Sequence, residues 1–393
     1  MQSTAKRPRN KPSRPAGFPL FAHQNGQWAK KVKGKLYYFG LWSDPDAALE
    51  RWLHDKDPLL AGRTPRPKSD QLTLRDLVNR FLTSKKHRVD SGELSPRSWR
   101  DCDRSCALIV AEFGRNRLVD DLTADDFERL RRSLSKTRKA LAVGNEIGRI
   151  RSVFKYGFEC GLLEQPVRFG PGFQKPNRKT VRLERQAKTL KNGERMFESE
   201  ELRTIIAEAP QPLKAMILLG ANCGYGQSDI GCLTHSAIDL ETNWCEHPRP
   251  NTAVERRCPL WPETTAALRE VVEGPQREPK DDADRGIVFL TSHRRRWSYT
   301  SPAGSPVDNC GSEFSKLLKR LNLKRPGRSF YALRHGFETI GSGAKDQTAV
   351  DFLMGHTGQS MSAAYRERIE DSRLVAVTEH VHAWLFPEGS DDE

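Results

Sequence analysis

The sequence predicts a mainly α protein with small β elements (α+β) and more than one domain. Three observations predict this fold class. Four consecutive segments place apolar residues at helical spacing, two short runs near the N-terminus have the composition of strands, and polar, proline-containing stretches separate these blocks. The 393 residues also exceed the length at which single hydrophobic cores stop growing, roughly 250 to 300 residues.

The N-terminal block is predicted to begin with a basic arm, residues 1–16, followed by a small module, residues 17–62. Within the module, 27–32 and 36–41 are expected strands, and a helix opens at Ser43-Asp44-Pro45. Lysines interleaved with aromatic residues favour an accessory DNA-binding module. The alternative is a basic hairpin on the surface of a larger domain. The lysines predicted to bind DNA are Lys30, Lys31, Lys33 and Lys35.

Residues 63–70 form a polar linker with two prolines, and residues 71–165 are predicted to form a helical domain. Apolar periodicity predicts helices over 72–84, 96–113, 124–134 and 141–163, which together suffice for a compact bundle. Thr123, followed by Ala-Asp-Asp, is placed to cap the third of these helices.

Residues 166–195 combine three prolines with nine basic residues, so this linker cannot bury much apolar surface. It either lies along a phosphate backbone or is a solvated linker without a specific partner. Apolar periodicity then resumes and predicts a domain over 196–387, followed by an acidic tail, 388–393. The linker residues predicted to bind DNA are Arg178, Lys179, Arg182 and Arg185.

The charge of the chain predicts a polyanionic partner. The formal net charge is +14, and residues 1–43 contain no Asp or Glu. Lys and Arg bind phosphates with release of condensed counterions, although charge alone does not distinguish DNA, RNA and a membrane surface. The mean hydropathy is −0.69, and no apolar run approaches the ~20 residues of a membrane span. The basic start also lacks the apolar core of a secretory signal, so we expect a soluble, cytoplasmic protein with no membrane partner.

The eight cysteines include no Cys-x-x-Cys pair, and none is placed with histidines at zinc-ligand spacing. We therefore expect reduced cysteines that serve mostly in packing, with no metal ion and no other cofactor. A small-molecule substrate is not expected either.

Three segments near the C-terminus carry the residues of a chemical site. They are Tyr331-Ala-Leu-Arg334-His335, then Leu353-Met-Gly-His356, and then Ser-Ala-Ala-Tyr365, nine residues beyond the last histidine. Together they resemble the second conserved box of the tyrosine recombinases, or phage integrases. In that family the pattern is His-x-Leu-Arg-His, later Leu-Gly-His, with the nucleophilic tyrosine nine residues after that histidine.

The resemblance implies a C-shaped clamp around duplex DNA, made of a helical core-binding domain and a catalytic domain. Residues 246–260 resemble the family's β-hairpin, and residues 17–62 resemble the arm-type DNA-binding module of some integrases. Tyr365 would attack the phosphate, Arg334 would hold its non-bridging oxygens, and His356 would donate to an oxygen or help to position the proton. A phenol with a pKa near ~10 is a poor nucleophile at neutral pH, so cationic neighbours are needed to favour the phenolate. The covalent link conserves the energy of the cut bond, so neither ATP nor a metal is required.

The sequence departs from the family at three positions. Gly226 stands where the first box carries an arginine, although Asp229 matches the acid that follows it. Asn251 falls near the hairpin lysine, and Tyr331 replaces the first histidine of the second box. Losing one transition-state donor typically costs ~10² to 10³ in rate. Arg249 is a possible substitute cation, and the other basic residues predicted to contact DNA in this region are Arg256, Arg257, Arg294 and Arg295.

Three functions remain open on these residues. The first is a site-specific recombinase or integrase, which would act as a homotetramer on two DNA duplexes. The second is a non-catalytic relative that occupies or regulates recombination sites, and the third is a DNA relaxer like type IB topoisomerases. Residues 375–386 resemble the C-terminal helix that relatives pass to a neighbouring protomer, but they could equally form a helix packed on its own domain.

Overall fold

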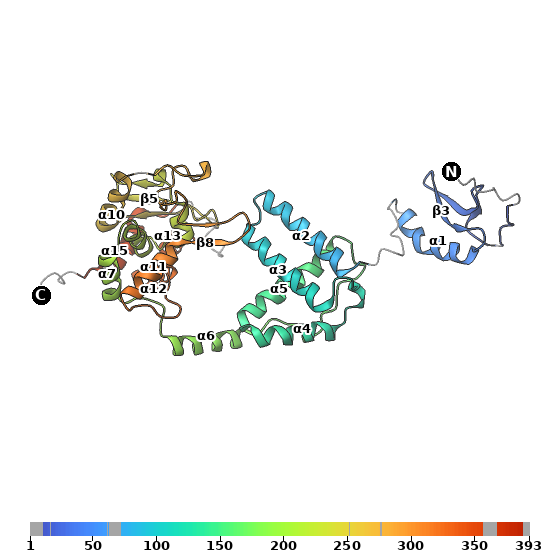
Figure 1. Cartoon of the computed structure of the whole chain (residues 1–393), viewed down its shortest axis with the longest axis horizontal. Coiled ribbons are helices and arrows are strands. Elements are labelled where there is room, and N and C mark those ends of the chain that lie inside the picture. Colours follow the sequence, from blue (N-terminus) through green and yellow to red (C-terminus); the bar gives the residue numbers. More distant parts are fainter. Residues whose placement is uncertain are drawn as a thin grey trace. The chain divides into compact units, whose positions relative to one another are not determined.

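The computed structural model describes residues 11–15, 17–60, 62, 72–250, 252–275, 277–356 and 368–387. The chain forms two compact units, which are described separately below (Figure 1). Their composition is Met1–Thr73 with Asn116–Asp121, and Leu74–Arg115 with Leu122–Glu393. Within the described residues, no helix is both long enough and apolar enough to cross a membrane.

The first unit contains an antiparallel sheet of β1 (Phe21–Ala22), β2 (Gln27–Val32) and β3 (Lys35–Leu41), with helix α1 (Pro45–Leu60) packed against β3. Both predicted strands and the predicted helix start are confirmed. Lys33 and Gly34 have positive φ values of 46° and 82°, as a two-residue hairpin turn of type I′ requires. Trp28, Phe39 and Trp52 are buried between the sheet and α1.

The second unit begins with four helices, all of which the apolar periodicity predicted: α2 (Leu74–Asp90), α3 (Pro96–Phe113), α4 (Ala124–Thr137) and α5 (Ala140–Glu159). The Ser95 side chain caps α3 by accepting from the Ser98 amide. The predicted cap of α4 is present as a reciprocal capping box between Thr123 and Asp126.

The basic linker contains a helix that the sequence did not predict, α6 (Arg178–Asn192). All three prolines precede it, and the Asn177 side chain accepts from the Thr180 amide at 2.8 Å, which starts the helix immediately after Pro176. No residue of α6 is buried. Its basic residues at positions 178, 182 and 185 share one face, because residues four and seven apart lie on the same side of a helix.

The remaining part of the second unit is mainly helical with two small antiparallel sheets. The first sheet has the order β4-β5-β6, and the second pairs β7 with β8. The strands are β4 (Ile238–Asp239), β5 (Trp244–Glu246), β6 (Arg257–Pro259), β7 (Ser298–Thr300) and β8 (Pro306–Asp308). The helices are α7 (Ser199–Glu208), α8 (Leu213–Asn222), α9 (Gln227–Cys232), α10 (Pro262–Glu273), α11 (Asn309–Arg320), α12 (Tyr331–Gly341), α13 (Gln347–Met354) and α15 (Asp371–Leu385). Short 3₁₀ turns of this part are η2 (His235–Ala237), η3 (Asp282–Asp284) and η4 (Ser342–Ala344), whereas η1 (Val119–Asp121) belongs to the first unit.

Helix α8 is the centre of this core, because nine of its ten residues are buried and α7, α10, α11, α12 and α15 all contact it. A helix that is apolar all round is expected only where neighbours surround it. The C-terminal end of α8 leads through Gly224 into the short helix α9. This turn therefore has a fixed position relative to α12, which packs along the same helix.

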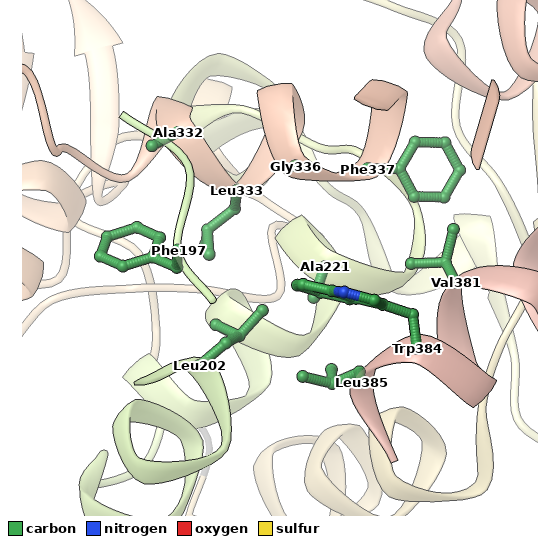
Figure 2. A pocket seen from close by; sticks show the side chains of 10 residues that line it. All are labelled: Phe197, Leu202, Ala221, Ala332, Leu333, Gly336, Phe337, Val381, Trp384 and Leu385. Carbon is green, nitrogen blue, oxygen red and sulfur yellow. The ribbon is translucent and has the colours of Figure 1, made fainter. Parts of the chain in front are cut away.

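The last helix, α15, packs on its own domain, which was one of the two sequence-based alternatives. Trp384 and Leu385 lie against Leu202 and Ala221, with Phe337 nearby (Figure 2). The space between them is an apolar cavity of about 10 Å³, lined by ten residues, so it holds at most one water molecule and is no ligand site.

Candidate active site

Arg334 is the centre of the candidate site. Helix α12 turns Leu333 and Phe337 into the core and buries Arg334 with them, leaving its side chain 2% exposed. The guanidinium donates through Nη1 to the Gly224 carbonyl at 2.7 Å and through Nη2 to the Met354 carbonyl. These partners are neutral, so its positive charge is not cancelled by them. Burial, and after it the neighbouring Arg249, lowers the pKa of Arg334.

His356 lies directly against this guanidinium. Gly355 ends α13 with a φ of +61°, and the next residue turns its ring so that Nε2 is 3.2 Å from Arg334 Nη2. Nδ1 is 3.4 Å from a carboxylate oxygen of Asp351. An acid beside Nδ1 favours the tautomer that carries its proton there, which leaves Nε2 free to accept from Arg334. The guanidinium and the imidazole thus face the same space.

The β5–β6 hairpin brings further cations to this point. Its ladder continues past the strands, because the His247 amide donates to Arg256 and the Arg249 amide donates to Val254. Alternate residues of a hairpin share a face, so Arg249 and Arg256 lie on the same side as His247. Arg249 donates through Nη1 to the Gly355 carbonyl at 3.1 Å. A Cβ atom at Gly355 would lie 3.0 Å from Arg249 Cβ and 3.3 Å from Arg256 Cδ, so both arginine side chains pack closely against this glycine.

Arg256 forms a buried ion pair with Asp229 of α9. Its Nε donates to the His247 carbonyl at 2.7 Å, and the guanidinium lies 4.2 Å above the Tyr225 ring. The second Asp229 oxygen accepts from the Gly226 amide at 2.7 Å. The carboxylate therefore joins the start of α9 to the hairpin. Burial, followed by the charge of Arg256, lowers the pKa of His247 to about 4, so this ring is neutral at physiological pH.

Gly226 shows no backbone need for glycine. Its φ of −98° is open to any residue, and a Cβ there would lie 3.3 Å from the Tyr331 ring. Tyr331 itself is 41% exposed, and its ring stands 5.2 Å from that of His335. Tyr225 is fully buried, which raises its pKa well above the usual value and leaves its phenol unsuited to attack a phosphate. Tyr365 and Asn251 lie outside the residues that the structure describes.

The arrangement carries an excess of positive charge. The charges of Arg249 and Arg256 both act on the Arg334 guanidinium, and Asp229 is the carboxylate hydrogen-bonded to Arg256. Like charges gathered in a partly buried place disfavour one another's charged form, and an anion bound beside them offsets this. Among the described residues no group of three His, Cys, Asp or Glu side chains could hold a metal ion. The site therefore suits an anion such as a backbone phosphate.

The structure distributes the other predicted DNA contacts over separate surfaces. Arg257 is paired with Asp371 at 2.9 Å and with Glu246 at 3.3 Å, and it lies 4.1 Å from the centroid of Trp244. Lys30 donates to the Pro19 carbonyl at 3.0 Å. The remaining predicted residues are exposed: Lys31, Lys33 and Lys35 on the first unit, Arg178, Lys179, Arg182 and Arg185 on α6, and Arg294 and Arg295 on the turn before β7.

Sequence reasoning missed two members of the site. Asp351 lies five residues before His356, a spacing at which a helix end can place a carboxylate beside the following imidazole, and this local signal was available. His247 donates from Nε2 to the Asp229 carbonyl at 3.1 Å. That contact depends on how the hairpin packs against α9, and no local pattern marks it.

The chain was compared with known proteins by sequence and by structure. No model of a protein family matches the sequence, and no curated protein matches it. Among solved structures, the Tn1549 transposon integrase in complex with a circular intermediate DNA aligns with a TM-score of 0.53 at 14% identity, covering 78% of this chain and 99% of the other. A lambda integrase tetramer bound to a Holliday junction gives 0.53 at 15%, covering 91% and 99%. A lambda integrase dimer bound to a COC′ core site gives 0.54 at 15%, covering 91% and 100%.

These alignments run over nearly the full length of each solved chain, which for the Tn1549 integrase comprises residues 82–397, and they fit the mainly helical architecture with small antiparallel sheets. At such low identity the likeness concerns the fold alone. The resemblance predicted from the box around Arg334 and His356 is confirmed at that level, and the chain has the fold of the tyrosine recombinases.

Proposed function

We propose that this protein is a site-specific DNA recombinase or integrase of the tyrosine type, which cuts and rejoins DNA through a 3′-phosphotyrosyl intermediate. The observation that supports it most strongly is the contact between buried Arg334 and His356, at 3.2 Å, in a place with surplus positive charge. Buried charges are costly unless a partner compensates them. A buried site with excess positive charge is therefore expected where an anion binds.

In the proposed reaction the Tyr365 phenol oxygen attacks the phosphorus of a backbone phosphodiester. The bond from phosphorus to O5′ breaks, the phenolic proton leaves, and the departing 5′ oxygen takes up a proton. Arg334 holds a non-bridging oxygen as charge builds on it, and His356, whose Nε2 accepts from Arg334 in the structure, helps to position the proton. The 5′-hydroxyl of another strand reverses the same steps, so the reaction consumes no nucleotide.

The proposal extends to the partner and the assembly. Double-stranded DNA is the substrate, in keeping with the net charge of +14 and with the DNA present in the integrase structures of the same fold. A tetramer on two duplexes corresponds to the lambda integrase assembly on a Holliday junction. Residues 17–62 would bind arm-type sites, 71–165 the core site, and 196–387 would carry the chemistry of a mobile element. The place of action would be the cytoplasm, at the nucleoid in a bacterium.

A second candidate is a DNA-binding relative without catalysis, which occupies or regulates recombination sites. The specific observation in its favour is Gly226, whose backbone would accept an arginine although none is present there. This candidate shares the DNA binding of the first and differs only in the absence of a covalent step.

Covalent trapping separates the two. The preferred duplex is first recovered by selection from random sequences, and a nicked half-site made from it is incubated with the protein. An adduct that survives SDS is expected with the natural protein and with Tyr331→Phe, and none with Tyr365→Phe. Tight binding without any adduct would favour the non-catalytic candidate, while an adduct that persists in Tyr365→Phe would place the nucleophile elsewhere.

A further inference from the structure

Two guanidiniums from different elements donate hydrogen bonds to the segment Met354–His356. Arg334 on α12 donates to the Met354 carbonyl, and Arg249 on the hairpin donates to the next carbonyl, that of Gly355. The His356 ring, on the same segment, accepts from Arg334. Two guanidiniums and an imidazole therefore meet at one short stretch of backbone.

Arg249 differs from the other two hairpin arginines in combining spare donors with partial exposure and no carboxylate partner among the described residues. Arg256 is 3% exposed, and Asp229 and the His247 carbonyl bind its guanidinium, which leaves Nη1 without a hydrogen-bond partner but buried. Arg257 points to the opposite face of the hairpin and is held by Asp371 and Glu246. Among the described residues, the guanidinium of Arg249 has a single hydrogen-bond partner, the Gly355 carbonyl, although a guanidinium carries five N–H donors.

Arg249 is also accessible. Its side chain is partly exposed, whereas Arg334 beneath it is buried. No carboxylate among the described residues pairs with Arg249, which distinguishes it from Arg256 and Arg257. A cation that is partly buried beside another cation and lacks an acid is expected to recruit an anion from outside the protein.

Attack on a phosphodiester places charge on two non-bridging oxygens, and one guanidinium fork can hold only part of it. We propose that Arg249 is a catalytic residue that binds the same backbone phosphate as Arg334, so that the hairpin supplies the cation that position 226 lacks. This inference rests on the proposed function only in identifying that phosphate as the one that is cut.

The effect of Arg249 on Arg334 agrees with this placement. Among neighbouring charges, Arg249 contributes most to lowering the pKa of Arg334. A phosphate bound between the two guanidiniums would offset this repulsion. Gly355 makes the approach possible, because any Cβ at this position would meet the Arg249 side chain at 3.0 Å.

The test compares Arg249→Ala with Arg269→Ala, which removes one positive charge from an exposed arginine of α10 that pairs with Glu273. We expect Arg249→Ala to slow adduct formation on the nicked half-site about 100-fold, as for loss of one transition-state donor. Its affinity for the intact duplex falls less than about tenfold, with a salt slope smaller by about one. Arg269→Ala is expected to keep the adduct rate of the natural protein. Adding Gly226→Arg to Arg249→Ala is expected to restore about tenfold of the lost rate, because position 226 adjoins the same cluster.

An adduct rate in Arg249→Ala within about threefold of the natural rate would overturn the inference and leave the proposed function standing. An equal loss in Arg269→Ala would overturn it too, because a general loss of positive charge would then explain the effect.

A second measurement decides the case in which even the natural protein forms no adduct, so that the proposed function fails. Inorganic phosphate is titrated into protein labelled with ¹⁵N-arginine, and the Nε–H signals are assigned with Arg249→Lys and Arg334→Lys. We expect the Nε–H signals of Arg249 and Arg334 to shift with the same dissociation constant for phosphate. An Arg249 signal that stays fixed while that of Arg334 moves would overturn it.

Discussion

Arg256 and Asp229 form an ion pair whose side chains are only 1% and 8% exposed, and it ties the β5–β6 hairpin to the start of α9. Breaking such a pair by removing one partner leaves an uncompensated buried charge, which costs about 3–5 kcal/mol. We expect Arg256→Met to lower the free energy of unfolding by about this amount in urea titrations.

The matched control is Arg257→Met, whose exposed ion pairs are worth about 1 kcal/mol or less. The double variant Arg256→Met with Asp229→Leu removes both charges and is expected to recover most of the loss. A double variant as unstable as Arg256→Met would show that the orphaned carboxylate is not the cause.

The buried His247 is expected to make the free energy of unfolding depend on pH. Its pKa in the folded protein is about 4, whereas the ordinary value is 6.5. Between these values the unfolded chain binds a proton that the folded chain does not, so the free energy of unfolding falls as the pH drops from 6.5 towards 4. The full window corresponds to about 3 kcal/mol, and above about pH 7 this group has no effect.

The check is urea unfolding at several pH values between 5 and 7 for the natural protein and for His247→Gln, whose amide can donate but does not titrate. The variant is expected to lose about 2 kcal/mol less than the natural protein between about pH 6.5 and pH 5. Parallel curves for the two proteins would assign the pH dependence to other groups.

Gly355 is predicted to be required for two separate reasons. Its φ of +61° disfavours any residue with a Cβ, and that Cβ would also crowd Arg249 at 3.0 Å. Gly286 has a φ of +75° but open space around it, so Gly286→Ala measures the backbone strain alone, about 1–2 kcal/mol. Gly355→Ala is expected to cost about 1–3 kcal/mol more, as overpacking does, and to reduce adduct formation as well. Equal costs at the two glycines would contradict the predicted crowding.

Because α15 packs on its own domain, we expect the stability of this domain not to depend on protein concentration. Leu385 is fully buried, so Leu385→Ala is expected to cost about 2–5 kcal/mol. The urea midpoint of the natural protein should be the same at about 1 µM and about 50 µM, because mass action affects stability only when partners bind. A midpoint that rises with concentration would indicate a helix supplied by a neighbouring chain.

Local patterns predicted most of the elements. The four helices of 74–159 followed from apolar spacing such as that of Cys106, Ile109 and Phe113, and the N-terminal strands ended where the turn residues indicated. Helix α6 was missed because three prolines and nine basic residues resemble an extended linker. The decisive feature was the order of the chain, since all the prolines come before the capping Asn177.

The part of the site that comes from one sequence segment, with its residues at a characteristic spacing, was predictable. Arg334 and His356, singled out from the sequence box, lie in contact, although their roles remain predictions. The pairing of Arg256 with Asp229 could not be foreseen, because it spans 27 residues and depends on how the hairpin folds over α9. The three hairpin arginines cannot be told apart from the sequence, whereas in the folded protein each has different partners.

The ion pair between Arg257 and Asp371 links the hairpin to the first turn of α15. Damage that loosens the C-terminal helix would also release this arginine into solvent. Such a variant would become less stable and, at the same time, more attractive to nucleic acid of any sequence. Tighter retention on random DNA after a C-terminal mutation would then be a symptom of partial unfolding, and it should not be mistaken for improved recognition.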